Sequence, residues 1–146
     1  MTSPITYGPA RFLPGEQISI TTNPDTEPFW LAAKEHRLTA CQCASCGAFR
    51  MPPTPFCPVC SSTDKAWPDL PGTGTVFSYA ICNKNFVTGE DYVYVPVVVD
   101  LDGAPGTRLV ANITGCFAED VHIGMKVTVE WTPINDGWVL PNFRAI

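Results

Sequence analysis

Charge and histidine are scarce in this chain of 146 residues, and both shortages limit its chemistry. Nine basic residues against fourteen acidic ones give a formal net charge of −5. That balance argues against a partner made of phosphate backbone, so we do not expect a nucleic acid as ligand. The two histidines are His36, on the charged side of an expected helix, and His122, in a polar turn. Both positions favour a structural or solvated imidazole over a catalytic one.

Long apolar runs and common catalytic signatures are also missing. No apolar segment approaches the roughly 20 residues of a membrane span, and Met-Thr-Ser-Pro at the start has no basic segment followed by an apolar core. We therefore expect a soluble, cytoplasmic protein with no membrane partner. There is no Gly-x-Gly-x-x-Gly, phosphate-binding loop or Gly-x-Ser-x-Gly. We find no catalytic residue to assign and predict that the chain carries out no reaction alone.

Cysteine, by contrast, is plentiful, and four of the seven residues form a regular pattern. A Cys-Ala-Ser-Cys-Gly segment is followed by Cys-Pro-Val-Cys, with ten residues between the inner two cysteines. Each pair can place two thiolates on one metal, so the spacing predicts a tetrahedral zinc site. The predicted ligands are Cys43, Cys46, Cys57 and Cys60. Because four thiolates leave no open position, the predicted Zn²⁺ is structural. Two disulfides, a redox Cys-x-x-Cys or bound iron are the alternatives.

The three remaining cysteines do not suggest a nucleophile. Cys41, Cys82 and Cys116 have no local feature that would lower a thiol pKa, and buried cysteines on strands are the commoner case.

Proline and glycine, 15 and 11 residues, divide the chain into three parts. Residues 1–24 are predicted to form an extended N-terminal arm, in which Gln17 to Thr21 could add an edge strand. Residues 25–68 are predicted to hold a short helix and a zinc ribbon, and residues 69–146 a β-barrel.

The expected helix begins near Asp25 or Thr26, where a cap is followed by glutamate and proline. Phe29 and Trp30 lie on its apolar side. Their rings either pack on the ribbon or anchor a subunit interface, and we take both as candidate partner contacts.

From Gly72 onward the hydrophobic pattern has period two and predicts five strands. Pro96, inside the second predicted strand, indicates an edge or a bulge. Five short strands with one long connection between the third and fourth favour an OB-type barrel. The loop from Asn83 to Asp91 is longer than a tight hairpin needs and places Phe86 near its tip. Phe86 is a third candidate partner contact, although its ring could equally fold back over the barrel mouth.

The combination of motifs resembles the DUF35 family. The residues that carry the resemblance are Phe29-Trp30, Cys43-x-x-Cys46-Gly47, Met51-Pro52-Pro53, Cys57-Pro58-x-Cys60, Gly72-x-Gly74-Thr75-Val76-x-Ser78-Tyr79, Val97 to Leu101 and Glu119-Asp120-Val121-x-Ile123-Gly124-Met125. It implies a mainly β chain, with a short helix and rubredoxin-like zinc ribbon followed by a five-stranded OB-fold barrel.

The resemblance also implies a function, which is that of an accessory subunit without catalytic residues. Its partner would be a thiolase-superfamily enzyme, such as a thiolase or a lipid-transfer-type aldolase of steroid degradation, in a heterotetramer that reaches acyl-CoA through the partner. Two alternatives stay open. The barrel could bind coenzyme A directly, if Arg50, Lys65, Lys84, Arg108 or Lys126 converge on its phosphates. Aromatic residues such as Phe77, Tyr79, Tyr92 and Tyr94 could also stack single-stranded bases.

Overall fold

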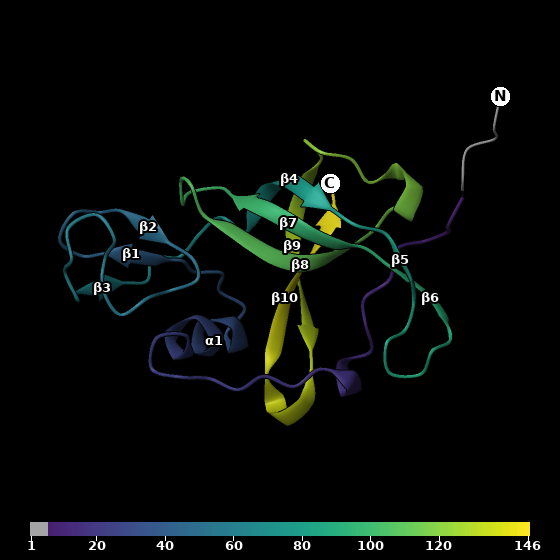
Figure 1. The fold of residues 1–146 in the computed structure, drawn as a ribbon, viewed down its shortest axis with the longest axis horizontal. Coiled ribbons are helices and arrows are strands. Elements are labelled where there is room, and N and C mark those ends of the chain that lie inside the picture. The colour runs from purple at the N-terminus through teal and green to yellow at the C-terminus, as the bar shows by residue number, and fades with distance from the viewer. Residues whose placement is uncertain (1–5) are drawn as a thin grey trace.

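The computed structural model describes residues 6–146, and its first segment lies along the outside of a β-barrel (Figure 1). This arm is anchored at Ala10, whose N–H donates to the Cys116 carbonyl at 3.0 Å and whose side chain is buried. The first five residues of the predicted arm lie outside the described residues.

The prediction of an edge strand in the arm is wrong. A 3₁₀ turn, η1 (Gly15–Gln17), occupies this place, and no strand follows it before the helix. The amide of Asn135 donates instead to the Glu16 carbonyl and to Ser19 Oγ. The backbone N–H of Asn135 also donates to the Ile18 carbonyl at 3.3 Å. One residue, Asn135, therefore holds this part of the arm, where we had predicted a strand.

Helix α1 (Glu27–Lys34) begins where the sequence predicted, with Thr26 as its N-cap residue. Asn23 prepares this start, because its Oδ1 accepts the N–H groups of Asp25 and Thr26 at 2.9 and 3.0 Å. The buried side of α1 carries Phe29, Ala32 and Ala33. Just beyond its end His36 adopts a left-handed backbone, with φ of 58°, and the chain turns toward the ribbon.

The ribbon is a sheet of very short strands, ordered β2-β1-β3. They are β1 (Cys41–Cys43), β2 (Phe49–Arg50) and β3 (Lys65–Ala66). Strands of two or three residues cannot hold a sheet together alone. The buried guanidinium of Arg50 adds some support, since its Nε and Nη2 donate to the Thr54 carbonyl. The ribbon still needs another source of stability, and the metal centre described below supplies it.

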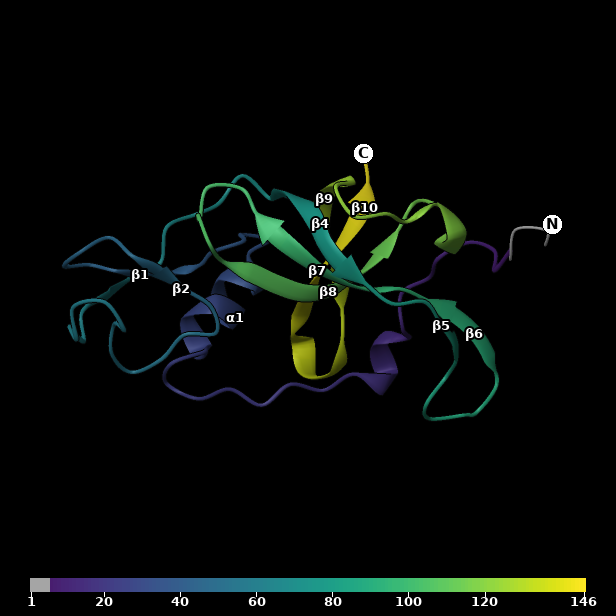
Figure 2. The same cartoon turned by 45° about the horizontal axis from the view of Figure 1, so that its top comes forward.

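The second β unit is a closed barrel of five strands, as predicted, in the order β10-β8-β7-β4-β9. Figures 1 and 2 show it beside the ribbon and α1, with the β9–β10 hairpin projecting past β8. Its strands are β4 (Thr73–Tyr79), β7 (Pro96–Leu101), β8 (Arg108–Thr114), β9 (Lys126–Pro133) and β10 (Val139–Ala145). Two further 3₁₀ turns, η2 (Ala118–Asp120) and η3 (Asn135–Gly137), precede β9 and β10.

The second predicted barrel strand divides at Val95 into two elements. Its first part is β6 (Asp91–Tyr94), which pairs with β5 (Cys82–Lys84) in a hairpin outside the barrel. Its second part is β7, which begins at Pro96. The expectation of an edge or a bulge at Pro96 is corrected, because a strand's first residue is another place that tolerates a missing N–H. The bulge lies on the neighbouring strand, between Val76 and Ser78 of β4.

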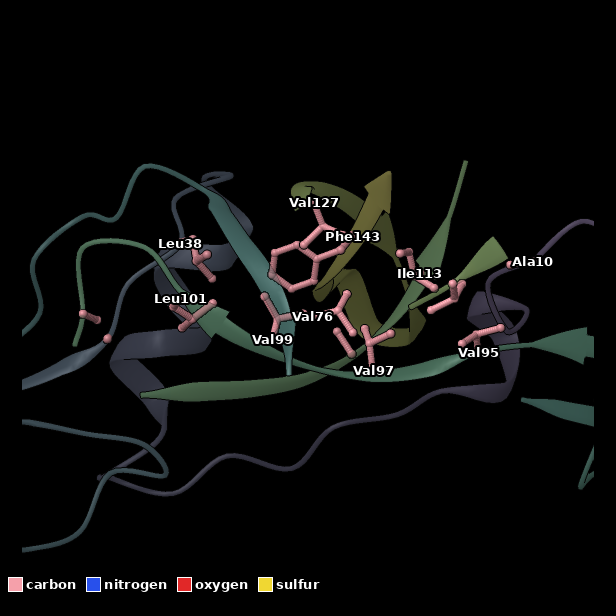
Figure 3. Packing of buried hydrophobic residues seen from close by; sticks show 14 of the residues in the cluster. Ala10, Leu38, Val76, Val95, Val97, Val99, Leu101, Ile113, Val127 and Phe143 are labelled. Carbon is pink, nitrogen blue, oxygen red and sulfur yellow. The ribbon is translucent and has the colours of Figure 1, made fainter. Parts of the chain in front are cut away.

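A single apolar core fills the barrel and continues toward the ribbon (Figure 3). Alternate residues of β7, Val97 and Val99, are at most 1% exposed, and Phe143 of β10 is fully buried among them. Gly74 lets β4 approach β7 closely, because a Cβ there would lie 2.5 Å from Val99 Cγ1. Leu38, between α1 and the ribbon, belongs to the same core. Within the described residues, no helix is long and apolar enough to cross a membrane.

Candidate functional site: a four-cysteine metal centre

The four predicted metal ligands come together at the end of the ribbon. Their sulfur atoms all lie within 4.8 Å of one another. Cys43 Sγ is 3.6 Å from Cys60 Sγ, and Cys46 Sγ is 3.6 Å from Cys57 Sγ. A tetrahedral zinc with bonds of about 2.3 Å requires sulfurs about 3.8 Å apart. The cluster therefore fits a zinc ion, and each of its closest contacts joins one cysteine pair to the other.

The two cysteine pairs are built by the same backbone turn. In the first, Gly47 N–H donates to the Cys43 carbonyl and Cys43 N–H to the Ala48 carbonyl. Residues 57–62 repeat both bonds, from Ser61 N–H to the Cys57 carbonyl and from Cys57 N–H to the Ser62 carbonyl.

The repeated turn needs a left-handed residue after its second cysteine. Gly47, with φ of 81°, fills this position in the first turn, and Ser61, with φ of 66°, fills it in the second. Glycine adopts this backbone without steric cost, whereas a serine there is strained. Both cysteine pairs therefore have the same tight turn, which orients their sulfur atoms.

Backbone N–H groups prepare two of the sulfurs for the metal. The N–H of Cys46, 3.4 Å from Cys43 Sγ, is the main reason that the pKa of the Cys43 thiol is lowered from 9.0 to about 6. The N–H groups of Cys60 and Val59 lower the pKa of the Cys57 thiol in the same way. Because zinc binds thiolates, these N–H groups favour the metal-binding form. Four sulfur donors would hold zinc as a structural ion and leave no position for water.

The other cysteines and the histidines do not assemble into a reactive group within the described residues. Burial raises the pKa of the Cys41 and Cys116 thiols, which keeps them protonated. His36 stacks on Trp131 with ring centroids 5.5 Å apart, and His122 Nδ1 lies 2.9 Å from the Asp120 carbonyl. The structural or solvated role of both histidines stays a prediction.

The three candidate partner contacts differ in how much surface they offer. Phe29 is 5% exposed and packs edge-to-face on Trp30 inside the chain, whereas Trp30 itself is half-buried. Phe86 is 85% exposed at the β5–β6 turn, and one edge of its ring meets Tyr94. Trp30 and Phe86 thus remain open to a partner, while the Phe29 ring is already covered.

The five basic residues considered for a phosphate site are each occupied locally. Arg50 bonds the Thr54 carbonyl, and Lys65 lies near Asp25 and the Pro55 carbonyl. The other three have partners on their own or neighbouring strands, which are Asp91 for Lys84, Asp100 for Arg108 and Thr75 for Lys126. Each of the five therefore spends part of its hydrogen-bonding capacity within the chain.

The candidate base-stacking residues do not form one surface either. Tyr94 is buried, the Tyr92 hydroxyl donates to the Phe12 carbonyl, and Phe77 lies under the Arg108 guanidinium.

Family models match both β units. Residues 30–66 match the model "ChsH2, rubredoxin-like zinc ribbon domain" and residues 67–132 match "ChsH2, C-terminal OB-fold domain". The chain is thus a zinc ribbon joined to an OB fold, with a structural zinc site, as the sequence predicted. A "DUF35 domain-containing scaffold protein" of Methanocaldococcus jannaschii is 30% identical over 112 residues, which cover 73% of this chain and 77% of that protein. The chain belongs to the DUF35 family.

A solved structure and two longer relatives extend the comparison. The structure of an "Ltp2-ChsH2(DUF35) aldolase" matches with a TM-score of 0.79 and 35% identity, over 87% of this chain and 98% of that chain. A "Probable enoyl-CoA hydratase alpha subunit" of Thermomonospora curvata is 38% identical over 117 residues, or 80% of this chain. The "3-oxo-4,17-pregnadiene-20-carboxyl-CoA hydratase alpha subunit" of Mycobacterium tuberculosis is 29% identical over 127 residues, or 87% of this chain. The chain spans 36% and 40% of the lengths of these two hydratase subunits.

Proposed function

We propose that this chain is a noncatalytic, zinc-binding scaffold subunit of a thiolase-superfamily enzyme, an aldolase or a thiolase, that acts on acyl-CoA thioesters. One observation carries the proposal. The chain aligns with almost the whole of a solved DUF35 chain whose structure is named as an aldolase with Ltp2. A bulky acyl group of the steroid type is the substrate we favour, because one relative is named for a pregnadiene carboxyl-CoA.

The chemistry of the described residues supports a scaffold. The sulfur cluster has the donor set of a closed structural site, and the thiols of Cys41 and Cys116 are held in the protonated form. Glu119, in the η2 turn that precedes His122, accepts the backbone N–H groups of Tyr7 and Gly8. A carboxylate used in this way positions the arm and is not free to act as a base. The reacting groups would therefore come from the partner.

A hydratase is the second candidate for the partner. It is supported by the relative that is 38% identical and is named as a hydratase alpha subunit. In that arrangement this chain would correspond to the DUF35 part of a subunit whose remaining part carries the hydratase chemistry. Direct acyl-CoA binding and single-stranded nucleic-acid binding gain no support from the placement of the basic and aromatic residues described above.

Co-expression tests the proposal. We would produce the chain with an aldolase, a thiolase and a hydratase subunit from its own gene neighbourhood and measure mass by size exclusion with light scattering. We expect a stable complex with one of them, with two copies of each chain, and conversion of an acyl-CoA substrate only when both chains are present. Turnover of a thioester by the purified chain alone, or a chain that stays separate from every candidate, would contradict the proposal.

A further inference from the structure

Strand β8 is paired from its first residue onward on one side but only at its end on the other. Its register with β7 runs from Arg108 opposite Asp100 to Asn112 opposite Pro96. On the other side β10 pairs with β8 at Ile113 and Thr114. Within residues 6–146 no strand pairs with residues 108–111 of β8 on that side. This segment is an open edge in an otherwise closed barrel.

The hydrogen-bond pattern shows which backbone groups point to the open edge. Ile113 N–H donates to the Val95 carbonyl, and Leu101 N–H to the Thr107 carbonyl, so the odd-numbered residues of β8 face β7. In an antiparallel pair the residues between them face away. Asn112 confirms this, because its N–H donates to Asn142 Oδ1 on the β10 side. The N–H and C=O groups of Arg108 and Val110 therefore point away from β7, into the open edge.

The edge is open because β10 turns away from β8. The parallel register, with Phe143 opposite Ile113, would place Pro141 opposite Ala111 if the ladder continued. Proline has no N–H to donate, so the ladder loses a bond at this point. The side chain of Asn142 takes over by accepting the Asn112 N–H, and the β9–β10 hairpin continues past β8 (Figure 1).

Two apolar hollows lie along this edge and share Val110. The first, about 290 Å³, is bounded by Trp30 of α1, Met51 and Pro53 after β2, and residues 108–110. The second, about 250 Å³, is bounded by residues 110–112, Leu140 of β10 and Phe86 of the β5–β6 turn. Val110 is 71% exposed between them. The two aromatic residues that remain open to a partner therefore each line one of two hollows that share Val110.

The charge of the residues that line the two hollows indicates which kind of partner would fit there. Among the residues that line the two hollows, Arg108 alone carries a charge, although the chain has more acidic than basic residues. Its Nε donates to Asp100 Oδ1 at 2.9 Å, and its side chain is about half exposed. A guanidinium has five N–H donors, so one bond to Asp100 leaves Arg108 able to bind a second carboxylate.

We propose that an extended segment of a partner polypeptide adds as a strand to β8 beside Arg108 and Val110. Its backbone bonds the free N–H and C=O groups, apolar side chains fill the two hollows, and an acidic residue reaches Arg108. The inference rests on the proposed function, since the partner is the enzyme subunit. It adds where on this chain the partner binds, and that the partner binds as an added β-strand.

Amide exchange in the isolated chain gives the first test. The probes are two synthetic peptides, acetyl-Glu-Val-Thr-Phe-Thr-Val-Thr-amide and its reverse sequence, which allow for either strand direction. In the free chain we expect the Val110 N–H to exchange at least about tenfold faster than the N–H groups of Leu109 and Ala111, which face β7. With one of the peptides at saturation, Val110 exchange should slow by at least about tenfold. A peptide methylated on alternate backbone nitrogens keeps the side chains and should give no such protection.

Variants carry the test into the complex with the enzyme subunit. Val110→Lys places a charge on the edge, which blocks strand addition, and should weaken the complex by at least about tenfold. Ile123→Lys is the matched control, because Ile123 is 69% exposed and lines neither hollow. Val110→Thr keeps a β-branched residue and the same backbone, so it should bind like the unmodified chain.

The outcomes separate this inference from the proposed function. If the unmodified chain forms the complex, but Val110→Lys does so equally well and neither peptide protects Val110, the strand inference is overturned and the scaffold proposal stands. If a peptide protects Val110 but no enzyme subunit binds, the scaffold proposal fails and the edge remains a polypeptide site. Equal binding of the methylated peptide would show a merely apolar contact. Protection that rises with chain concentration alone would assign the edge to a second copy. Either result overturns the inference.

Discussion

The two β units of this chain are stabilised in opposite ways. The ribbon strands have two or three residues, and four sulfurs converge at the end of the sheet. The barrel strands have six to eight residues and enclose a core of valine, isoleucine and phenylalanine. Metal ligation can thus stabilise a sheet that is too short to form a core, whereas the barrel is stabilised by its apolar core. The following four changes should separate these two sources of stability.

Loss of a metal ligand should have the largest effect, confined at first to the ribbon. We expect Cys46→Ser to abolish tight zinc binding and unfold residues 41–66, because structural zinc contributes about 10–16 kcal/mol in small zinc domains. Metal analysis and amide NMR would measure this. Cys41→Ser is the control, since Cys41 is buried in the ribbon but lies outside the sulfur cluster. Full zinc occupancy in Cys46→Ser would show that the ligand set is wrong.

Removal of a core ring should act on the barrel and leave the sulfur cluster intact. Phe143 is fully buried, so Phe143→Ala should lower the free energy of unfolding by about 3–5 kcal/mol. Urea denaturation followed by tryptophan fluorescence would measure the change, with zinc content recorded in parallel. A loss below about 1 kcal/mol would mean that the ring is not part of a close-packed core.

A smaller effect is expected where two barrel strands meet. Gly74→Ala should cost about 1–3 kcal/mol, since its Cβ would lie 2.5 Å from Val99 Cγ1 and 2.6 Å from the Asp100 carbonyl oxygen. In the double variant with Val99→Ala the side-chain clash disappears and the backbone clash remains. The double variant should therefore lose less stability than the two single variants lose together, and a double-mutant cycle measures the difference. Full additivity would show that β4 and β7 adjust independently.

The smallest effect concerns the start of the described arm, at Tyr7 and Gly8. The N–H groups of Glu119 itself, Tyr7 and Gly8 lower the pKa of the Glu119 carboxyl below 4.5. A carboxyl whose pKa is lowered by folding stabilises the folded state above its unfolded-state pKa. This stabilisation is lost as the pH falls through the folded-state pKa. Acidification below pH 4.5 should therefore release residues 7 and 8 before the barrel unfolds. NMR titration would follow this, and Glu119→Ala, which removes the acceptor oxygens, should show the released arm already at neutral pH.

Local patterns in the sequence predicted the ribbon, the helix and the number of barrel strands. The Cys-x-x-Cys pairs are short-range features, and the start of α1 is encoded by neighbouring residues from Asn23 to Pro28. The pairing of strands that lie far apart in the sequence was harder to predict. The break at Val95 and the turn at Gly15 depend on which strands accept a partner, and periodicity carries no such information.

For the candidate partner site, too, the residues could be predicted from local sequence, whereas their arrangement could not. Trp30 and Phe86 could be chosen from the sequence as aromatic residues in a short helix and a long loop. Their connection through Val110 could not, because it depends on the register between β8 and β10. Pro141, inside the fifth predicted strand, was the available signal, since a proline there indicates a ladder that loses a bond.

The position of Met51 and Pro53 connects the proposed partner site to the ribbon that the zinc would stabilise. These ribbon residues form one wall of the larger hollow, and β8 of the barrel forms another. A chain that has not yet acquired its ion would keep a folded barrel but lack that wall. Newly made subunits would then be sorted by metal status, with the loaded form entering the enzyme and the unloaded form left out of assembly.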